Sequence, residues 1–396
     1  MFPASSTDHA VMQTLARQAW LTSPASRLVF SALAATGATP RFVGGCVRDG
    51  LLGQPSADLD IAVVQPPEDN MRALEAAGVK VIPTGLKHGT ITAIAHGQLF
   101  EITTLRVDLK TFGRHAEVAF TDDWHRDAAR RDFTINAIYA DSGGQVFDPV
   151  GGRADLAGGR VRFVGDAAQR IAEDKLRILR FFRFQARFGR GAPEPEALAA
   201  CTAAASSING LSGERVRDET FKILALPNPG PTLDAMARSG VLHHILPQGF
   251  DLAGLANCDD DPLRRLSAIA TDGAGAIAAR LRLSNQQSRR LKFLMSPPHD
   301  YGTDISRPAL RQLLYDHGAD AITDLALQQG SPEQAVLVKD ANPPRFPLGG
   351  RDAIAAGMSP GPEVGELLHA LKQQWREDDF RADRDQLLSR LKDKVV

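Results

Sequence analysis

The stretch that decides the fold is Arg41–Val64, RFVGGCVRDGLLGQPSADLDIAVV, which reads as strand, glycine turn, helix and strand. Two glycines after the first strand, Gly44 and Gly45, let the backbone approach a phosphate closely and expose amide donors. Arg48 would add charged donors at the opening of the helix. The pattern therefore predicts a turn that binds phosphate.

Two aspartates, Asp58 and Asp60, lie two residues apart at the second strand of this stretch. At that spacing their side chains leave the same face of a strand and repel each other unless a cation lies between them. Carboxylate oxygens of this kind suit Mg²⁺, and paired metal ions stabilise phosphoryl transfer. An isolated Asp-x-Asp is more often a turn cap, but the glycine pair and Arg48 upstream favour a metal site.

Glu101 is a third candidate carboxylate, within the apolar strand pattern Leu99–Leu105. A buried unpaired glutamate is costly, so it requires a metal, an arginine or a proton. A salt bridge to Arg106 and an exposed strand position are the alternatives, and this residue alone does not decide between them and a catalytic role.

A polar cluster follows in Arg130–Ala137, where Arg131, Asp132 and Asn136 could contact a ribose and phosphates. A structural Arg–Asp pair is the alternative. The turn sequence Asp148–Gly152 then predicts the joint between an α/β unit and the helices that follow.

The helix predicted over Glu173–Phe184 places Asp174 and Arg177 three residues apart, as neighbours on its surface. Arg180 and Arg183 continue the same row, and the apolar residues between them would anchor the helix. An ordinary ion pair, which contributes only ~0.3 kcal/mol, is the simplest interpretation.

The functional interpretation of Asp174 and Arg177 concerns base selection. A carboxylate accepts from an exocyclic amine, and a guanidinium donates to a ring nitrogen. Cytosine and adenine both present an amine beside a ring acceptor, whereas uracil and guanine present the reverse order. One Asp/Arg pair could therefore select C and A without a nucleic-acid template.

Charge is balanced overall, with a net charge of −1 and a pI near 6.8, so RNA binding must rest on local charge. Residues 160–190 hold nine Arg or Lys against three acids, whereas the run Arg280–Lys292 is expected to be a solvated helix face. No apolar stretch is long enough for a membrane span, and no secretory signal is recognisable. Three widely spaced cysteines, Cys46, Cys201 and Cys258, favour a reducing cytoplasm.

The expected organisation is α+β. Residues 1–40 read as helical. Residues 41–150 alternate short β-branched runs with glycine and proline, and a hairpin is predicted at His96-Gly97. Five strands are expected at 41–43, 59–64, 79–82, 90–95 and 99–105. From about 166 the pattern is helical, with examples at 167–188, 194–205, 214–224, 263–270 and 362–372. Three parts are predicted: a head (1–150), a neck (151–225), and a body and tail (226–396).

Six segments together resemble the class II tRNA nucleotidyltransferase and poly(A) polymerase family, in the family's order and spacing. They are GGCVRD (44–49), DLD (58–60), RRDFTINA (130–137), DPVGG (148–152), EDKLRILRFFRF (173–184) and LSGERVRDE (211–219). The resemblance implies a polymerase-beta-like head with a mixed sheet, followed by an all-helical neck, body and tail.

The resemblance also implies roles for single residues. Asp58 and Asp60 would bind two Mg²⁺ ions, and Glu101 would be the third active-site carboxylate. Gly44, Gly45 and Arg48 would bind the triphosphate, Arg131 and Asp132 the ribose, with Asn136 beside them. Asp174 and Arg177 would read the base, and Arg180 and Arg183 would meet the triphosphate or the RNA backbone. Residues 211–219 would support the neck.

Within the family, CCA addition to tRNA from CTP and ATP is expected, because Thr84–Thr90 is similar to the tRNA enzymes. The long polar segment Val107–Arg126 is similar to the flexible loop of enzymes that complete all of CCA. The alternatives are a poly(A) polymerase, a non-catalytic RNA-binding protein and a nucleotidyltransferase acting on small molecules or proteins. No protein partner is predicted.

Overall fold

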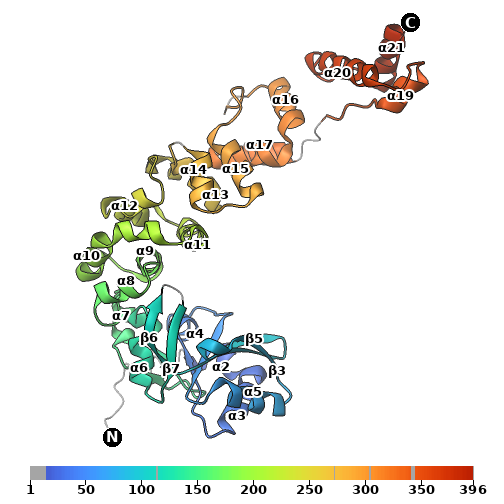
Figure 1. Ribbon diagram of the computed structural model, residues 1–396. Helices are drawn as coiled ribbons and strands as arrows, with labels where there is room; N and C mark the ends of the chain where they lie inside the picture. Colours follow the sequence, from blue (N-terminus) through green and yellow to red (C-terminus); the bar gives the residue numbers. More distant parts are fainter. Residues whose placement is uncertain (1–14, 113–114, 272, 303–304, 340–343, 396) are drawn as a thin grey trace. The chain divides into compact units, whose positions relative to one another are not determined.

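The computed structural model describes residues 15–112, 115–271, 273–302, 305–339 and 344–395, and the chain divides into two compact units, 1–247 and 248–396. The first unit contains a mixed sheet and helices, and the described part of the second is helical (Figure 1). The predicted α+β class is therefore confirmed. The predicted boundaries of head, neck and body stay a prediction.

A seven-stranded mixed sheet forms the head, in the order β3-β4-β5-β2-β1-β8-β9. Its strands are β1 (Arg41–Val43), β2 (Leu59–Val63), β3 (Lys80–Gly85), β4 (Thr90–Ala95), β5 (Gln98–Thr104), β8 (Tyr139–Ala140) and β9 (Val146–Phe147). Strands β2 and β5 are parallel, and the other pairs are antiparallel. The five strands expected between Arg41 and Leu105 are confirmed to within two or three residues at their ends.

The turn between β4 and β5 consists of His96 and Gly97, as predicted. Both have positive φ, 49° and 77°, which is the backbone of a two-residue turn that matches the twist of a hairpin. The result is an uninterrupted register from Thr90 opposite Thr103 to Ala95 opposite Gln98.

One face of the sheet is buried and the other is open where β4 and β5 lie. Ile91, Phe100 and Ile102 are almost fully buried, and helices α3 (Pro24–Ala34) and α5 (Pro67–Ala76) pack against β4. Alternation along a strand places Thr92 and Glu101 on the opposite face. This open face carries part of the candidate site.

Residues 107–126, expected to be a polar loop, form a second small sheet and the start of a helix. Strands β6 (Arg106–Phe112) and β7 (His115–Phe120) pair antiparallel, and α6 (Trp124–Ala129) follows. Residues 113 and 114 lie outside the described residues, as do residues 1–14 of the N-terminal stretch expected to be helical.

The remaining elements of the first unit are mostly helices. They are α2 (Ala19–Thr22), α4 (Gly45–Leu51), α7 (Gly152–Gly158), α8 (Ala167–Glu173), α9 (Arg177–Phe188), α10 (Pro195–Ala203), α11 (Gly213–Leu224) and α12 (Gly230–Arg238), with short 3₁₀ turns η1 (Leu86–His88), η2 (Thr134–Asn136), η3 (Ala205–Gly210) and η4 (Leu242–His244). Phe181 and Phe184 of α9 lie against Phe133, which joins these helices to the head.

The single helix expected over 167–188 is wrong, because the chain breaks between α8 and α9. Asp174 is extended, with φ −147° and ψ 107°, and its Oδ1 accepts a hydrogen bond from the backbone N–H of Leu176 at 3.1 Å. A short carboxylate that bonds nearby backbone competes with helix continuation. Apolar periodicity does not reveal this break, because the hydrophobic residues continue on both sides of it.

The second unit comprises η5 (Leu252–Asn257), α13 (Pro262–Ile269), α14 (Ala274–Arg280), α15 (Asn285–Met295), α16 (Arg307–His317), α17 (Ala319–Gln328), α18 (Pro332–Lys339), α19 (Gly350–Ala355), α20 (Pro362–Glu377) and α21 (Arg384–Val395). The helices expected at 263–270 and 362–372 are confirmed.

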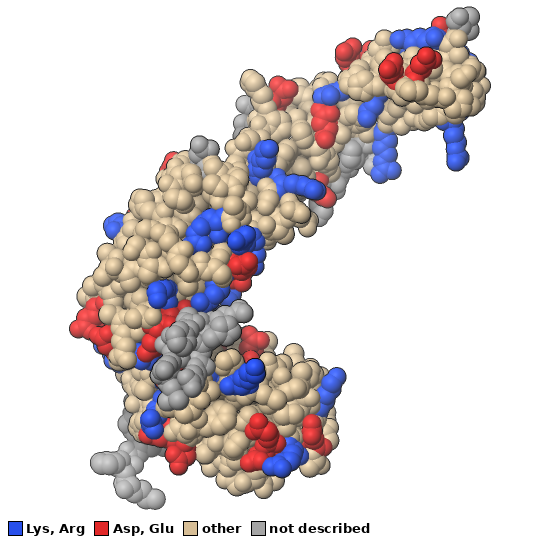
Figure 2. All heavy atoms as spheres, viewed as in Figure 1, with Lys and Arg blue, Asp and Glu red and all other residues tan. Residues whose placement is uncertain are grey.

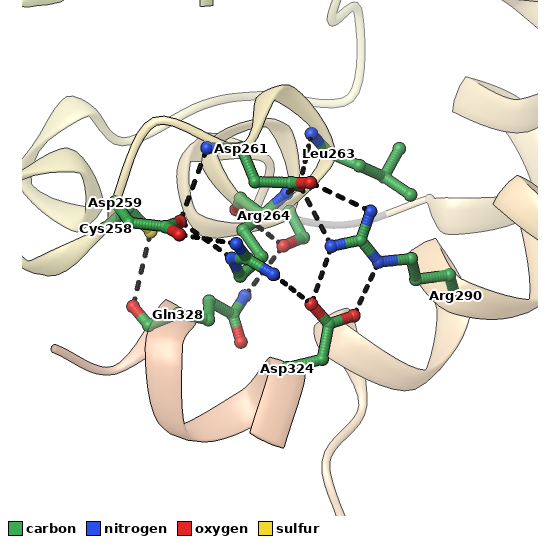
Figure 3. A network of polar contacts seen from close by, with 9 residues as sticks. Cys258, Asp259, Asp261, Leu263, Arg264, Arg290, Asp324 and Gln328 are labelled. Carbon is green, nitrogen blue, oxygen red and sulfur yellow. Dashed lines mark hydrogen bonds and ion pairs between the residues drawn. The ribbon is translucent and has the colours of Figure 1, made fainter. Parts of the chain in front are cut away.

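A network of ion pairs joins three of these helices (Figure 3). Asp324 of α17 accepts from Arg264 of α13 at 2.5 Å and from two nitrogens of Arg290 of α15 at 2.5 and 2.6 Å. Asp259 and Asp261 bind the other sides of the same two arginines. Arg290, part of the basic run expected to be a solvated helix face, therefore has a structural contact inside the unit.

Candidate active site

The glycine turn of the first motif connects β1 to α4 and faces the carboxylate strand. Gly44 has φ 76° and ψ −125°, a conformation that L side chains rarely adopt. A Cβ built on it would lie 3.8 Å from Asp60 Oδ2 and 3.9 Å from Arg131 Nη1. The absence of a side chain at 44 therefore leaves the turn open toward an acidic and a basic group.

The candidate catalytic carboxylates lie on neighbouring strands. In the parallel register Asp60 of β2 lies beside Glu101 of β5, and Asp58 precedes β2 by one residue. Asp60 is half-buried, whereas Asp58 and Glu101 are exposed. Exposure on the strand, one of the two alternatives for Glu101, is thus confirmed, while Arg106 binds the His88 carbonyl instead.

The environment of Asp60 disfavours its charged form. Burial, followed by repulsion from Glu101, raises the pKa of Asp60 to about 6, although Arg131 opposes the shift. Two neighbouring carboxylates that repel each other in this way form a site that a cation would stabilise. Within the described ranges no cluster of three or more His, Cys, Asp or Glu side chains is arranged to hold a metal ion.

A cavity of 440 Å³ opens beside these strands, within the first unit. It brings together ten of the predicted site residues: Gly44, Gly45, Arg48, Asp60, Arg131, Asp132, Asn136, Asp174, Arg177 and Arg180. It also includes four that were not predicted: Arg130, Leu176, Phe184 and Arg215. Asp58, Glu101 and Arg183 are not among its lining residues.

The cavity lining is strongly basic. Among the described residues that line it, six are arginines and three are aspartates, which favours an anionic ligand. Figure 2 shows Lys and Arg side chains, interspersed with acids, over the helices that follow the head. The local positive charge expected within 160–190 is therefore confirmed on Arg177 and Arg180.

Arg48, in the lining of the cavity, is held by contacts on several sides. Its Nε donates to Asp49 Oδ1 at 2.9 Å, its Nη1 donates to Asn136 Oδ1, and its guanidinium lies 4.2 Å from the ring centroid of Phe188. Only 5% of the residue is exposed. Asn136 therefore helps to fix the position of the Arg48 guanidinium through this hydrogen bond.

Arg131 pairs with Asp127 rather than with its neighbour Asp132. Its Nε donates to Tyr139 Oη at 3.1 Å, and its Nη2 donates to Asp127 Oδ2 at 3.1 Å. Although burial would raise the pKa of Asp127, the charges of Arg131 and Arg130 hold it well below its usual value. The alternative of a structural Arg–Asp pair is thus confirmed for Arg131, with a different aspartate, while its Nη1 faces the Gly44 turn.

Asp132 links the head to helix α9. Its Oδ2 accepts from Arg180 Nε at 2.7 Å, and its Oδ1 accepts from Asn136 Nδ2 at 3.1 Å. Burial alone would raise the pKa of Asp132, but the charge of Arg180 and these hydrogen bonds lower it to about 2. Asp132 is therefore an anion that fixes Arg180 at the cavity wall.

The predicted Asp174–Arg177 pair on one helix face is wrong, because the chain breaks between the two residues. Asp174 Oδ2 accepts from Arg215 Nη2 of α11 at 2.7 Å. Arg177 donates to Glu173 Oε2 at 2.7 Å and to the Arg130 carbonyl at 3.2 Å. Both residues nevertheless line the same cavity, so a ligand can meet an acceptor and a donor there.

Arg183, the last of the predicted arginine row, makes different contacts. Its Nε donates to Glu219 Oε2 at 2.6 Å, and its guanidinium lies 4.5 Å from the Phe184 ring centroid. Its nucleotide-binding role stays a prediction. The motif at 211–219 supplies both Arg215 and Glu219, so its expected support of the neck is visible in these two pairs, although the lining position of Arg215 was not expected.

Comparisons with known proteins agree with this geometry. A model for the Poly A polymerase head domain matches residues 40–162, and one for a probable RNA and SrmB-binding site of polymerase A matches 192–252. CCA tRNA nucleotidyltransferase 1, mitochondrial, of Mus musculus is 37% identical over 89% of this chain and 86% of its own. The CCA-adding enzyme of Limosilactobacillus fermentum is 32% identical over 92% and 95%.

Solved structures match as well. The Bacillus stearothermophilus CCA-adding enzyme in complex with CTP superposes with a TM-score of 0.76 and 26% identity, covering 94% of this chain and 98% of that one. The Thermotoga maritima enzyme complexed with tRNA, at 22% identity and a TM-score of 0.66, shares the fold over 98% of both chains. Among the described helices none has the length and apolarity needed to cross a membrane.

Proposed function

Because the chain belongs to the class II tRNA nucleotidyltransferase and poly(A) polymerase family, we propose that it adds C, C and A to tRNA 3′ ends, using CTP and ATP. The observation that carries the proposal is one cavity in which a carboxylate of β2, the glycine turn, and the acceptor and donors of α8 to α11 meet. The residues assigned to phosphate binding and base reading thus line one cavity together with Asp60, beside which Glu101 lies on β5.

The reaction is nucleotidyl transfer. The 3′-oxygen of the acceptor forms a bond to the α-phosphorus of the nucleotide, the bond from that phosphorus to the bridging oxygen breaks, and pyrophosphate leaves. Glu101 orients the attacking hydroxyl or takes its proton. Arg48, Arg131 and Arg180 bind the triphosphate and ribose, and they stabilise the charge that develops.

The aspartates fit a divalent cation, because Asp58 and Asp60 offer oxygen ligands, and a cation would relieve the burial and the repulsion from Glu101 that raise the pKa of Asp60. We assign them as ligands of two Mg²⁺ ions. Such ions, when bound, lower the pKa of the attacking hydroxyl and neutralise the phosphates. The chain's own part is to supply one carboxylate from β2, that of Asp60, and one from Asp58, the residue just before this strand.

Base selection is assigned to Asp174 with Arg177. Asp174 accepts from the exocyclic amine of cytosine or adenine, and Arg177 donates to the adjacent ring nitrogen. The bonds from Leu176 N–H and Arg215 hold the carboxylate in place while it does so.

Addition of the complete CCA, rather than part of it, is also proposed, and the length of the segment 107–126 supports it. Its hairpin spans strands β6 and β7 beside the head sheet. A cytoplasmic location is likewise proposed, supported by the three free cysteines.

The test is incorporation on a tRNA transcript that lacks its 3′ CCA, with each nucleotide alone and with CTP and ATP together. Addition of two C and one A followed by a stop is expected. Long A tails with ATP alone would identify a poly(A) polymerase, and no incorporation by folded protein with Mg²⁺ would favour a binding protein.

The metal assignment has its own control. Asp60→Ala should abolish incorporation, and EDTA should abolish incorporation by the wild type. Excess Mg²⁺ should restore the activity of the EDTA-treated wild type but not that of Asp60→Ala. Asp69→Ala, which removes an exposed carboxylate paired with Arg72 on α5, should leave incorporation unchanged. Full activity of Asp60→Ala would exclude the metal site.

A further inference from the structure

The open face of the head sheet continues past the carboxylates in one cross-strand row. In register, Asp60 of β2 lies beside Glu101 of β5, Glu101 opposite Thr92 of β4, and Thr92 opposite Ile82 of β3. Residues directly paired across strands point to the same face. A threonine is therefore the neighbour of Glu101 on the side away from Asp60.

Thr92 is half of a hydroxyl pair. Its Oγ1 lies 3.0 Å from Thr84 Oγ1, where either oxygen can donate. One hydroxyl proton is used in that bond, so the pair retains one proton to donate and lone pairs to accept. A partner that is itself both donor and acceptor, such as an alcohol, matches this pair.

The surroundings suit a nucleotide of RNA. Leu99 is 57% exposed and Ile82 is 38% exposed, which offers apolar contact to a ribose or base. Lys80 of β3 is exposed and lies opposite Ile94 of β4, and Ile94 lies opposite Leu99 of β5. The positive charge of Lys80 is therefore at the edge of the same face. This surface is continuous with the carboxylates and offers both apolar contact and a cation. Together these features indicate that it binds the 3′-terminal nucleotide of an acceptor RNA.

We propose that the Thr84–Thr92 hydroxyl pair binds the 2′-hydroxyl of the acceptor's terminal ribose and so selects RNA ends over 2′-deoxy ends. The inference rests on the proposed function, in which the 3′-hydroxyl of that ribose lies at Glu101. Adjacent strands are about 4.8 Å apart. A ribose whose 3′-oxygen lies at Glu101 can therefore present its neighbouring 2′-oxygen to β4. The 2′-hydroxyl is the group that distinguishes RNA from DNA.

The experiment compares two tRNA transcripts without CCA, ending in a ribonucleotide or in the same nucleotide without its 2′-hydroxyl, both with a free 3′-hydroxyl. Wild type should favour the ribose end in kcat/KM for the acceptor by about five- to tenfold, the effect of one neutral hydrogen bond. Thr92→Val and Thr84→Val should lower that ratio toward one by slowing the ribose-ended substrate only, and Thr92→Ser should restore it.

Thr103→Val is the matched control. Thr103 lies on the same face of β5, two residues from Glu101, and its hydroxyl pairs with Thr90 at 3.1 Å rather than with the proposed site. It should keep the wild-type ratio.

The outcomes separate the two proposals. Incorporation by wild type without a ribose preference would overturn this inference alone, as would an unchanged ratio in Thr92→Val or an equal loss on both substrates. Failure of wild type to extend the ribose-ended transcript would overturn the proposed function, and the inference with it.

Discussion

At the scale of single residues, Asp174 depends on Arg215 for its position. The two are 41 residues apart in sequence, each is 19% exposed, and their 2.7 Å ion pair is the tertiary contact that orients the carboxylate. Without it, the local bond from Leu176 N–H would remain to orient the carboxylate of Asp174. Arg215 is thus expected to act on base selection through another residue.

Arg215→Ala should reduce the preference for C and A over U and G by about tenfold, the effect of losing a charged hydrogen bond of ~1.5 kcal/mol. The measurement is kcat/KM for all four nucleotides on a tRNA lacking CCA. Arg217→Ala on the same helix removes an arginine that pairs with adjacent Asp218, and it should leave the preference intact. An equal loss for all four nucleotides would show a general structural role instead.

Asp132 makes stability depend on acid pH. Its pKa is lowered from 3.8 to about 2, so the unfolded chain binds its proton first as the pH falls. The stabilisation is therefore complete above about pH 4 and is lost as the pH falls toward 2, amounting to about 2 kcal/mol.

Asp132→Asn should remove this contribution, so urea unfolding of the variant should vary less between pH 4 and pH 2 than that of the wild type. Asp141→Asn, in an exposed turn before Gly143, provides the comparison. Parallel pH profiles for wild type and Asp132→Asn would contradict the assignment.

At the scale of elements, the contact between α7 and η2 depends on one glycine. A Cβ on Gly152 would lie 2.1 Å from the Thr134 carbonyl oxygen and 2.9 Å from Ile138 Cγ1. Backbone cannot retreat as a flexible side chain can, so the helix would have to move.

Gly152→Ala should therefore lower the free energy of unfolding by roughly 2 kcal/mol or more, measured by urea titration. Gly158→Ala at the other end of α7 is the matched variant, since its nearest neighbour would be an Arg160 side-chain atom at 3.8 Å. That change should be neutral or slightly stabilising, because alanine favours a helix. Similar losses in both variants would remove the close-approach explanation.

Elements were predictable where local pattern decides them. The β-branched runs predicted β1 to β5, and His96-Gly97 predicted the tight turn between β4 and β5. The break at Asp174 was not predictable, because a single side chain bonding to backbone two residues on leaves the apolar period unchanged. The hairpin β6–β7 was missed because its polar composition resembles that of a loop.

The candidate site shows the same division. Spacing within motifs indicated Gly44, Asp60 and Asp132, because each lies in a short motif that is recognisable within its own segment, and all three line the cavity. Arg215 was not expected in the cavity, because its pairing with Asp174 joins segments far apart in sequence. The sequence alone also could not decide whether Glu101 is buried, because its exposure depends on which face of the sheet the helices cover.

At the scale of the whole molecule, the cavity proposed for the nucleotide is lined, among the described residues, by side chains between 44 and 215 of the first unit. In the second unit, the network around Asp324 joins α13, α15 and α17, because arginines from α13 and α15 share the carboxylate of this residue, which is 9% exposed (Figure 3). We therefore expect that a substitution in this network changes the stability of the second unit without changing ligand binding in the cavity of the first.

Asp324→Asn should destabilise the second unit by about 3 kcal/mol, because it leaves Arg264 and Arg290 without their shared charge. Hydrogen exchange of peptides from α13, α15 and α17 should speed up, while the dissociation constant for CTP stays unchanged. Asp320→Asn, an exposed residue in the first turn of α17, should have a much smaller effect. Unaltered exchange in Asp324→Asn would show that the network contributes nothing to this unit.

The helix break at Asp174 has a consequence for how such an enzyme can change over evolution. The side chain assigned to choose the nucleotide is also the one that ends α8 and starts the turn into α9. A substitution of Asp174 that changed the base preference would therefore also alter the turn between α8 and α9. If Asp174 selects the base as proposed, a new preference acquired at this position would need a second substitution that stabilises the turn, which makes the choice of nucleotide harder to change.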